Sequence, residues 1–119
     1  MSPPRILVVD DEVDVQAVVG DVLAEDGYDV DTVGTSQDAI DAVDRCSYDA
    51  VLCDVRLPGC HGQMLAAEIV RRRPGLANRI ILLTGESSDL RATLTLPVLA
   101  KPFSLDAILD AIRARLSSP

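Results

Sequence analysis

Polar side chains able to do chemistry stand at the ends of several apolar runs in this 119-residue chain. The residues in these positions are Asp10, Asp11, Asp54, Thr84 and Lys101. A carboxylate is costly next to a buried strand unless it serves a site. Three carboxylates, a hydroxyl and an ammonium group could together form a phosphoryl-transfer site that holds a divalent cation.

Electrostatic repulsion between the carboxylates indicates which kind of ligand these residues could bind. Two carboxylates about 4 Å apart repel by roughly 4 kcal/mol at an effective dielectric constant near 20. Three of them must shift their pKa values, bind cations, or do both, and Lys101 supplies one positive charge. A hard divalent cation with oxygen ligands would balance them, and a small cluster with room for water and phosphate suits Mg²⁺. A carboxylate can itself act as the nucleophile and form an acyl phosphate.

Five short apolar runs alternate with segments of helical periodicity along the chain. The runs cover residues 6–9, 28–33, 50–53, 80–83 and 98–100. Strands that alternate with helices predict an α/β fold, a parallel sheet with helices on both faces. The first, third and fourth runs are uniformly apolar, as central strands are, and the second alternates, as an edge strand does. The predicted architecture is a doubly wound five-stranded sheet of flavodoxin-like order 2-1-3-4-5.

This order places the polar residues together. The carboxyl ends of parallel strands share one edge of the sheet, and ligands bind where the strand order changes direction, here between strands one and three. Local signals support the helices: Gly27 is placed to end the first, Thr35 or Ser36 to cap the second, and Ser104 to cap the last.

Four stretches together resemble the receiver domain of response regulators in two-component signalling. They are I-L-V-V-D-D-E (6–12), V-L-C-D-V-R-L-P-G-C-H-G (51–62), I-I-L-L-T-G (80–85) and K-P-F (101–103). Their order and spacing match over essentially the whole chain, and the combination is far more specific than any one stretch.

The resemblance implies roles for individual residues. Asp54 is expected to accept a phosphoryl group from a phosphohistidine on a sensor histidine kinase or histidine phosphotransfer protein, and its carboxylate is also expected to contact Mg²⁺. Asp11 is the expected direct ligand of Mg²⁺, Asp10 holds it through water, and the main-chain carbonyl of Arg56 completes the protein's share of the shell.

The hydroxyl and the ammonium group have roles of their own by the same resemblance. Thr84 is expected to bond the phosphoryl oxygen and Lys101 to form an ion pair with it. Two departures concern the output surface, which acts on a downstream protein target that the sequence does not identify. Val98 replaces the usual aromatic residue, and Lys101 follows Thr84 by only 17 positions, which shortens the region around 88–95.

Composition restricts the class of protein. The net charge of −8 argues against direct nucleic-acid binding, and the basic cluster 71–73 is interpreted as complementing the dipole at the end of its own helix. No apolar run is long enough to span a membrane and no signal peptide is evident, so we expect a cytoplasmic protein. Residues 1–119 are expected to form a single receiver domain. The start at Met1 favours a stand-alone or N-terminal receiver, and the alternative is a receiver that belongs to a larger chain such as a hybrid kinase.

The three cysteines predict no disulfide framework, because Cys46, Cys53 and Cys60 are odd in number and form no C-x-x-C pair. Cys53 is expected to be a small buried hydrophobe. Cys60 and His61 are adjacent, but without a matching second pair they are a weak zinc signal.

Other functions remain as alternatives. A phosphoacceptor domain catalyses only its own phosphorylation and dephosphorylation, without turnover of an external substrate. A phosphatase of the haloacid-dehalogenase type also uses a strand-end Asp, a Thr and a Lys, but needs a second acid where this chain has Arg56. An interaction module that no longer responds to phosphorylation is a third possibility, favoured by Val98. A nucleotide- or flavin-binding domain is set aside because no Gly-rich phosphate loop follows the first run.

Overall fold

The five main strands form one parallel sheet in the order β2-β1-β3-β6-β7, in a computed structural model that describes residues 3–84, 98–100 and 104–117. The strands are β1 (Arg5–Val9), β2 (Asp29–Val33), β3 (Ala50–Asp54), β6 (Ile80–Thr84) and β7 (Val98–Ala100). All four strand pairs are parallel. Taken in chain order, this is the arrangement 2-1-3-4-5, so the predicted fold is confirmed.

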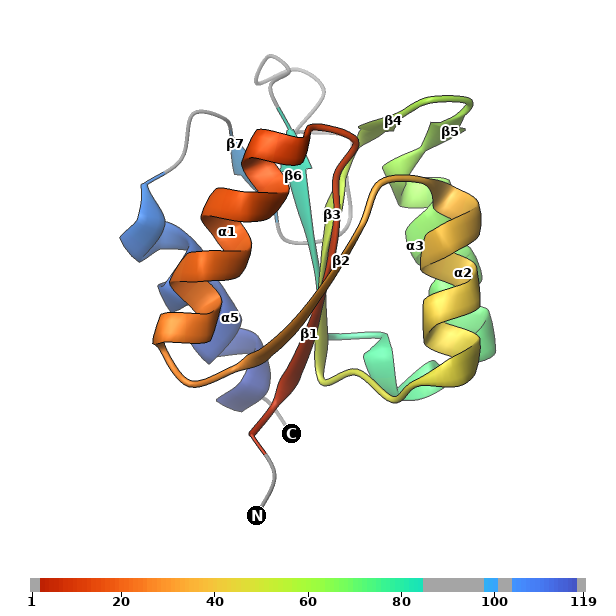
Figure 1. Cartoon of the computed structure of the whole chain (residues 1–119). Helices are drawn as coiled ribbons and strands as arrows, with labels where there is room; N and C mark the ends of the chain where they lie inside the picture. The colour runs from red at the N-terminus through yellow and green to blue at the C-terminus, as the bar shows by residue number, and fades with distance from the viewer. Residues whose placement is uncertain (1–2, 85–97, 101–103, 118–119) are drawn as a thin grey trace.

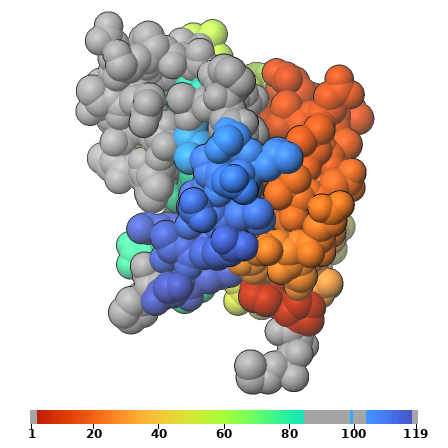
Figure 2. All heavy atoms as spheres, turned by 90° about the vertical axis from the view of Figure 1, so that its left-hand side faces the viewer, coloured from red at the N-terminus to blue at the C-terminus, as the bar shows by residue number. Residues whose placement is uncertain are grey.

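Helices cover both faces of the sheet (Figure 1). One face carries α1 (Val13–Glu25) and α5 (Leu105–Ser117), and the other carries α2 (Ser36–Arg45) and α3 (Gly62–Arg72). Figure 2 shows α5 in blue lying against α1 in orange, and Arg113 of α5 donates 3.0 Å hydrogen bonds to both carboxylate oxygens of Asp26. No helix in the described ranges is both long and apolar enough to cross a membrane.

The two faces have separate hydrophobic cores because alternate residues of a strand point to opposite sides. Val9, Cys53 and Leu82 pack beneath α2 and α3, whereas Val8 and Leu52 pack beneath α1 and α5. All of these side chains are fully buried. Burial on both sides explains why the central strands are apolar without alternation.

The predicted helix signals are confirmed. Gly27 follows α1 at a φ of 96°, in the left-handed region where a glycine is free of side-chain strain. Thr35 Oγ1 accepts a 3.1 Å hydrogen bond from Asp38 N at the start of α2. Ser104 Oγ accepts one of 3.0 Å from Ala107 N at the start of α5. Each cap satisfies a main-chain group that the helix itself leaves without a partner.

Short elements after β3 and α3 were absent from the sequence prediction. β4 (Arg56–Leu57) and β5 (Cys60–His61) pair antiparallel as a small hairpin, and Gly59 in its turn has a φ of 73°. The 3₁₀ helix η1 (Pro74–Leu76) follows α3. Two-residue strands carry too little pattern to be found by periodicity. The region around 88–95, which the sequence indicates to be shortened, lies outside the described residues.

The basic cluster 71–73 lies at the C-terminal end of α3, as expected for charges that complement the dipole of that helix, and it also contacts the neighbouring helix. Arg73 Nε donates a 2.7 Å hydrogen bond to the main-chain oxygen of Val43, and Arg72 forms a 2.6 Å ion pair with Asp44. These partners lie in α2, so two of the three arginines join α3 to the C-terminal end of the neighbouring helix. The cluster therefore complements the C-terminal ends of both helices.

Candidate functional site

Strand register brings the predicted acidic residues to one place. β1 pairs with β3 so that Val9 lies opposite Cys53, and Asp10 and Asp54 are the next residues along the two segments. Asp10 N also donates a 3.1 Å hydrogen bond to Val33 O, which continues the pairing with β2. The sheet therefore holds the two aspartates side by side at its carboxyl edge.

Asp11 completes a cluster of three carboxylates. Asp10, Asp11 and Asp54 each offer one oxygen, and these oxygens lie within 4.8 Å of one another. Asp10 is fully buried, Asp54 is 5% exposed, and Asp11 is exposed to solvent. Three carboxylates this close repel one another strongly, so the cluster is suited to a cation.

Main-chain N–H groups orient the two buried carboxylates. Glu12 N donates a 2.9 Å hydrogen bond to Asp10 Oδ1. Arg56 N donates one of 3.0 Å to Asp54 Oδ1. Hydrogen bonds of this kind fix the orientation of a carboxylate and hold its other oxygen in a defined direction. The site therefore presents carboxylate oxygens in fixed directions.

The hairpin after Asp54 is locked to the sheet and to α3. Val55 N donates a 2.8 Å hydrogen bond to Leu83 O, and Gly62 N donates one of 2.6 Å to Val55 O. A Cβ added at Gly62 would lie 2.7 Å from Val55 Cα and closer still to the main-chain oxygen of Asp54. Only glycine lets α3 begin this close to the strand end, and no sequence pattern had indicated this role for Gly62.

Cys53, the residue that precedes Asp54 in β3, is a chemically unreactive thiol. Cys53 is fully buried, and its Sγ donates to the main-chain oxygen of Asp54 at 3.5 Å. Burial, and then the negative charge of Asp54, raise the pKa of the Cys53 thiol. Cys53 therefore remains a neutral thiol and packs as the predicted small hydrophobe.

Thr84 occupies the expected place and Lys101 lies outside the described residues. Thr84 is 1% exposed at the end of β6, the strand that pairs with β3, and its neighbour Leu83 lies opposite Asp54. Thr84 also pairs with Ala100, the residue that immediately precedes Lys101 in the sequence.

The weak zinc signal at Cys60 and His61 finds no further ligands among the residues that the structure describes. His61 caps α3, because its Nδ1 accepts a 3.1 Å hydrogen bond from Gln63 N. Among the residues that the structure describes, the aspartate cluster is the group of three or more side chains whose potential metal-ligand atoms lie close together. All of its donors are carboxylate oxygens, which suit a hard cation such as Mg²⁺ rather than zinc.

A residue of α1 also supports the site. Gln16 Nε2 donates a 2.6 Å hydrogen bond to the main-chain oxygen of Asp10. Gln16 is half-buried, and its Nε2 lies against Gly34, where an added Cβ would approach it to 3.3 Å. Sequence periodicity assigns a residue to a helix but not to a partner, so this contact was not predicted.

Comparison with known proteins identifies the family. Residues 6–113 match the response regulator receiver domain, so the chain belongs to this family. The chain is 38% identical over 117 residues to the transcriptional regulatory protein TcrA of Mycobacterium tuberculosis, a match that covers 96% of this chain and 46% of that protein. It thus spans about half the length of the first of the curated relatives that it matches. Receiver domains serve two-component systems, in which they are phosphorylated and interact with histidine kinases or phosphotransfer proteins.

Other similar proteins match this chain along their full length. The sporulation initiation phosphotransferase F of Bacillus subtilis is 31% identical over 123 residues, covering 98% of this chain and 96% of that protein. The response regulator TrrA of Thermotoga maritima, solved with Mg²⁺ and BeF, has a TM-score of 0.82 and 33% identity over 95% of this chain and 99% of that one. The receiver domain of a Pseudomonas aeruginosa sensor histidine kinase, solved with a magnesium ion in its active-site cleft, has a TM-score of 0.83 and 31% identity, covering 98% and 100%.

Proposed function

We propose that Asp54 is the phosphoacceptor of this receiver domain. The observation that carries the proposal is the 5% exposed Asp54 carboxylate, which lies beside Asp10 and Asp11 with one oxygen oriented by Arg56 N. A carboxylate oxygen of Asp54 would attack the phosphorus of a phosphohistidine. The P–N bond would break, the histidine ring nitrogen would keep its electron pair, and an acyl phosphate would form on Asp54.

The acidic cluster is the proposed Mg²⁺ site. Asp10, Asp11 and Asp54 would hold the ion with the main-chain carbonyl of Arg56, and the all-oxygen donor set fits it. When bound, Mg²⁺ supplies positive charge that offsets the charge on the phosphoryl oxygens. The residues of this chain orient the nucleophile and exclude water from its buried side.

Thr84 and Lys101 are proposed to contact the phosphoryl group. The buried position of Thr84 at the end of the strand beside β3 supports a hydroxyl that donates to a phosphoryl oxygen. Lys101 would supply an ammonium group to a second oxygen, as the resemblance implies. Charge-assisted hydrogen bonds of this kind stabilise the developing charge in phosphoryl transfer.

The family supports a proposal for the biological setting of this domain. Residues 1–119 would act as one receiver domain in the cytoplasm, accept the phosphoryl group from a sensor histidine kinase or histidine phosphotransfer protein, and pass the signal to a protein target. The domain would catalyse only its own phosphorylation and dephosphorylation. Its net charge of −8 supports partners that are proteins rather than nucleic acids.

The test is labelling with acetyl phosphate in the presence of Mg²⁺, followed by intact mass measurement. Wild type should gain one phosphoryl group, and Asp54→Asn should gain none while it keeps its fold. The Asp49→Asn variant removes a different strand-associated carboxylate and should label as wild type does. Equal labelling of wild type and Asp54→Asn would exclude Asp54 as the acceptor.

A further inference from the structure

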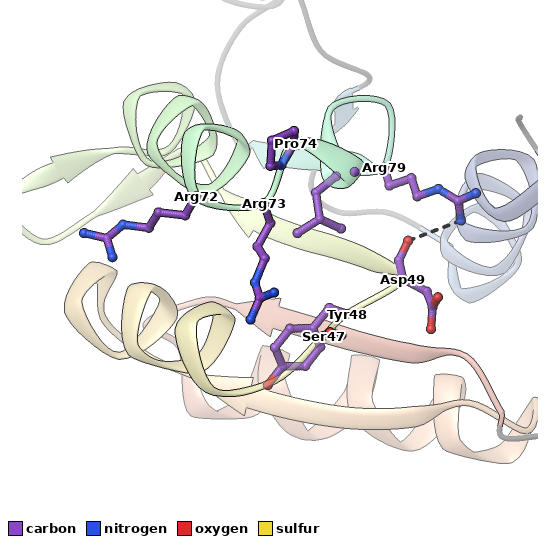
Figure 3. Close-up of a pocket in the computed structure, with 9 residues that line it drawn as sticks. Ser47, Tyr48, Asp49, Arg72, Arg73, Pro74 and Arg79 are labelled. Atoms are coloured by element: carbon purple, nitrogen blue, oxygen red, sulfur yellow. Dashed lines mark hydrogen bonds between the residues drawn. The ribbon is translucent and has the colours of Figure 1, made fainter.

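A cavity lies at the end of the sheet opposite the aspartate cluster. It has a volume of about 450 Å³ and lies between residues 47–49, which lead into β3, and residues 72–76 with Arg79, which lead into β6. These segments precede the strands, whereas the aspartates follow them. Figure 3 shows the side chains that line the cavity. The proposed phosphorylation chemistry uses none of them.

The lining of this cavity is positively charged in an acidic protein. Arg72, Arg73 and Arg79 line it with one carboxylate, that of Asp49, although the whole chain has a net charge of −8. Local charge that opposes the net charge so clearly can attract anions to one place. The partners of each charged group decide which of them is available to a ligand.

Arg72 and Asp49 are engaged with other groups. Arg72 forms ion pairs with Asp44 at 2.6 Å and Glu68 at 2.7 Å. Asp49 Oδ2 accepts a 2.8 Å hydrogen bond from Arg5 N, and Figure 3 shows the Asp49 carboxylate pointing away from Arg73. Arg79 Nη1 lies 3.5 Å from the main-chain oxygen of Asp49.

Arg73 has no carboxylate partner within ion-pair distance in the part of the chain that the structure describes. Its hydrogen bonds go to two main-chain oxygens, from Nε to Val43 at 2.7 Å and from one Nη to Asp44 at 3.3 Å. The residue is half-buried, and its guanidinium extends from α3 toward Tyr48 (Figure 3). A partly buried guanidinium that meets only neutral acceptors keeps its full charge and several N–H donors for an anion.

The hydroxyl groups opposite Arg73 are compatible with an anion. Tyr48 donates a 2.7 Å hydrogen bond to Asp31 Oδ2, and burial and then this hydrogen bond raise the pKa of the Tyr48 phenol. Tyr48 therefore stays neutral at physiological pH and adds no negative charge to the cavity. Ser47 lies at the exposed rim and can donate its hydroxyl hydrogen.

We propose that this cavity is an anion-binding site that takes a carboxylate- or phosphate-bearing ligand through Arg73. The planar guanidinium fork matches the geometry of both groups. Because the cavity lies at the opposite end of the strands from Asp54, binding does not require phosphorylation. The site is therefore a second point at which an acidic small molecule or an acidic segment of a protein can contact this domain.

The test is an NMR titration of the ¹⁵N-labelled protein without Mg²⁺ and at constant ionic strength. Three probes are added separately: sodium phosphate, sodium acetate and a short glutamate-rich peptide, with sodium chloride as the reference. A probe supports the proposal if it causes saturable shifts of the amide signals of residues 47–49 and 75–76 and of the Arg73 Nε–H signal. Shifts with phosphate alone narrow the ligand to phosphate groups, whereas tighter binding of the peptide favours a protein segment.

Three variants test whether the Arg73 guanidinium carries the binding. Arg73→Gln should weaken binding about tenfold or more, since a charge-assisted hydrogen bond contributes roughly 1.5–3 kcal/mol. Ser47→Asp places a negative charge at the rim of the cavity, leaves the contacts of Arg73 with α2 intact and should weaken anion binding similarly. If Arg73→Gln unfolds, the affinity of Ser47→Asp still tests whether anions bind in this cavity. Arg113→Gln is the matched control and should bind as wild type does.

Two results would overturn the proposal. One is the absence of saturable shifts with all three probes. The other is unchanged affinity in the folded Arg73→Gln and Ser47→Asp variants. Asp54→Asn should bind the anions as wild type does, so failure of this site and failure of the proposed phosphorylation site are distinguishable.

Discussion

Gln16 of α1 holds the main-chain oxygen of Asp10 at 2.6 Å, so a helix side chain supports the loop that carries the acidic pair. The same loop is held on its other side by the 3.1 Å hydrogen bond from Asp10 N to Val33 O. Both contacts act on the main chain and leave the Asp10 carboxylate to the site. The direction of the carboxylates therefore depends on a residue that is not itself a ligand.

Replacing Gln16 should weaken Mg²⁺ binding. Gln16→Leu removes the donor to Asp10 O at similar side-chain size, and loss of such a supporting contact typically lowers metal affinity about tenfold or more. Mg²⁺-dependent amide shifts measure the dissociation constant directly. Gln37→Leu is the control, because Gln37 is exposed on α2 and its Nε2 donates a 2.9 Å hydrogen bond to Asp41 of the same helix. Equal affinity of Gln16→Leu and wild type would show that the loop holds its shape without this contact.

Gly62→Ala should destabilise the protein and disturb Asp54. The new methyl group would overlap the main chain of Asp54 and Val55, and neither is a flexible side chain that could move aside. Overpacking of this kind costs about 1–3 kcal/mol. Urea unfolding measures the loss, and acetyl-phosphate labelling should be slower. Gly75→Ala is the control, since a Cβ there meets nothing within 4 Å; a loss as large at Gly75 would contradict the steric argument.

Asp11→Asn should stabilise the fold without Mg²⁺ and reduce the response to Mg²⁺. The variant removes one of three carboxylates whose oxygens lie within 4.8 Å of one another. Each pair at this distance repels by about 1–3 kcal/mol, depending on the effective dielectric constant. Thermal unfolding in EDTA and in Mg²⁺ measures both effects. Asp21→Asn removes an exposed carboxylate of α1 outside the cluster and should leave the difference between the two conditions unchanged.

Acid should weaken the cluster of ion pairs that Glu68 forms with Arg71 and Arg72 at the end of α3. Hydrogen bonds from Arg71 and then Arg72 lower the pKa of Glu68 from 4.5 to about 2. Since the folded pKa is depressed, the stabilisation is present above pH 4.5 and is lost as the pH falls toward 2. Glu68→Gln should therefore be less stable than wild type at about pH 6, and the difference should shrink below the ordinary pKa of a glutamate.

The size of this acid effect should be small and sensitive to salt. Glu68, Arg71 and Arg72 are surface groups, and exposed ion pairs are screened by solvent and ions. Denaturant unfolding at about pH 6 and about pH 3, with and without roughly 0.5 M sodium chloride, measures both dependences. Asp110→Asn is the control, because its contact with Arg113 lies on the other face of the sheet. A constant difference between Glu68→Gln and wild type over this pH range would exclude titration of Glu68 as the cause.

The strand order and the meeting of the aspartates could be predicted from the sequence. Buried parallel strands are apolar throughout, an edge strand alternates, and turn residues mark the ends of helices, so each pattern depends on neighbouring residues alone. Once the order 2-1-3-4-5 is inferred, Asp10 and Asp54 must share an edge, because parallel strands end on the same side. The roles of Thr84 and Lys101 at the phosphoryl group came from the resemblance, and both stay predictions.

Only the tertiary structure decided the contacts that support these elements. The hydrogen bond from Gln16 to Asp10, the close approach of Gly62 to Asp54 and the contact of Arg73 with Asp44 depend on how helices are rotated and seated on the sheet. Periodicity indicates which face of a helix is buried but not which atom it meets. Side-chain contacts between residues distant in the sequence are set by packing, and packing is a property of the whole fold.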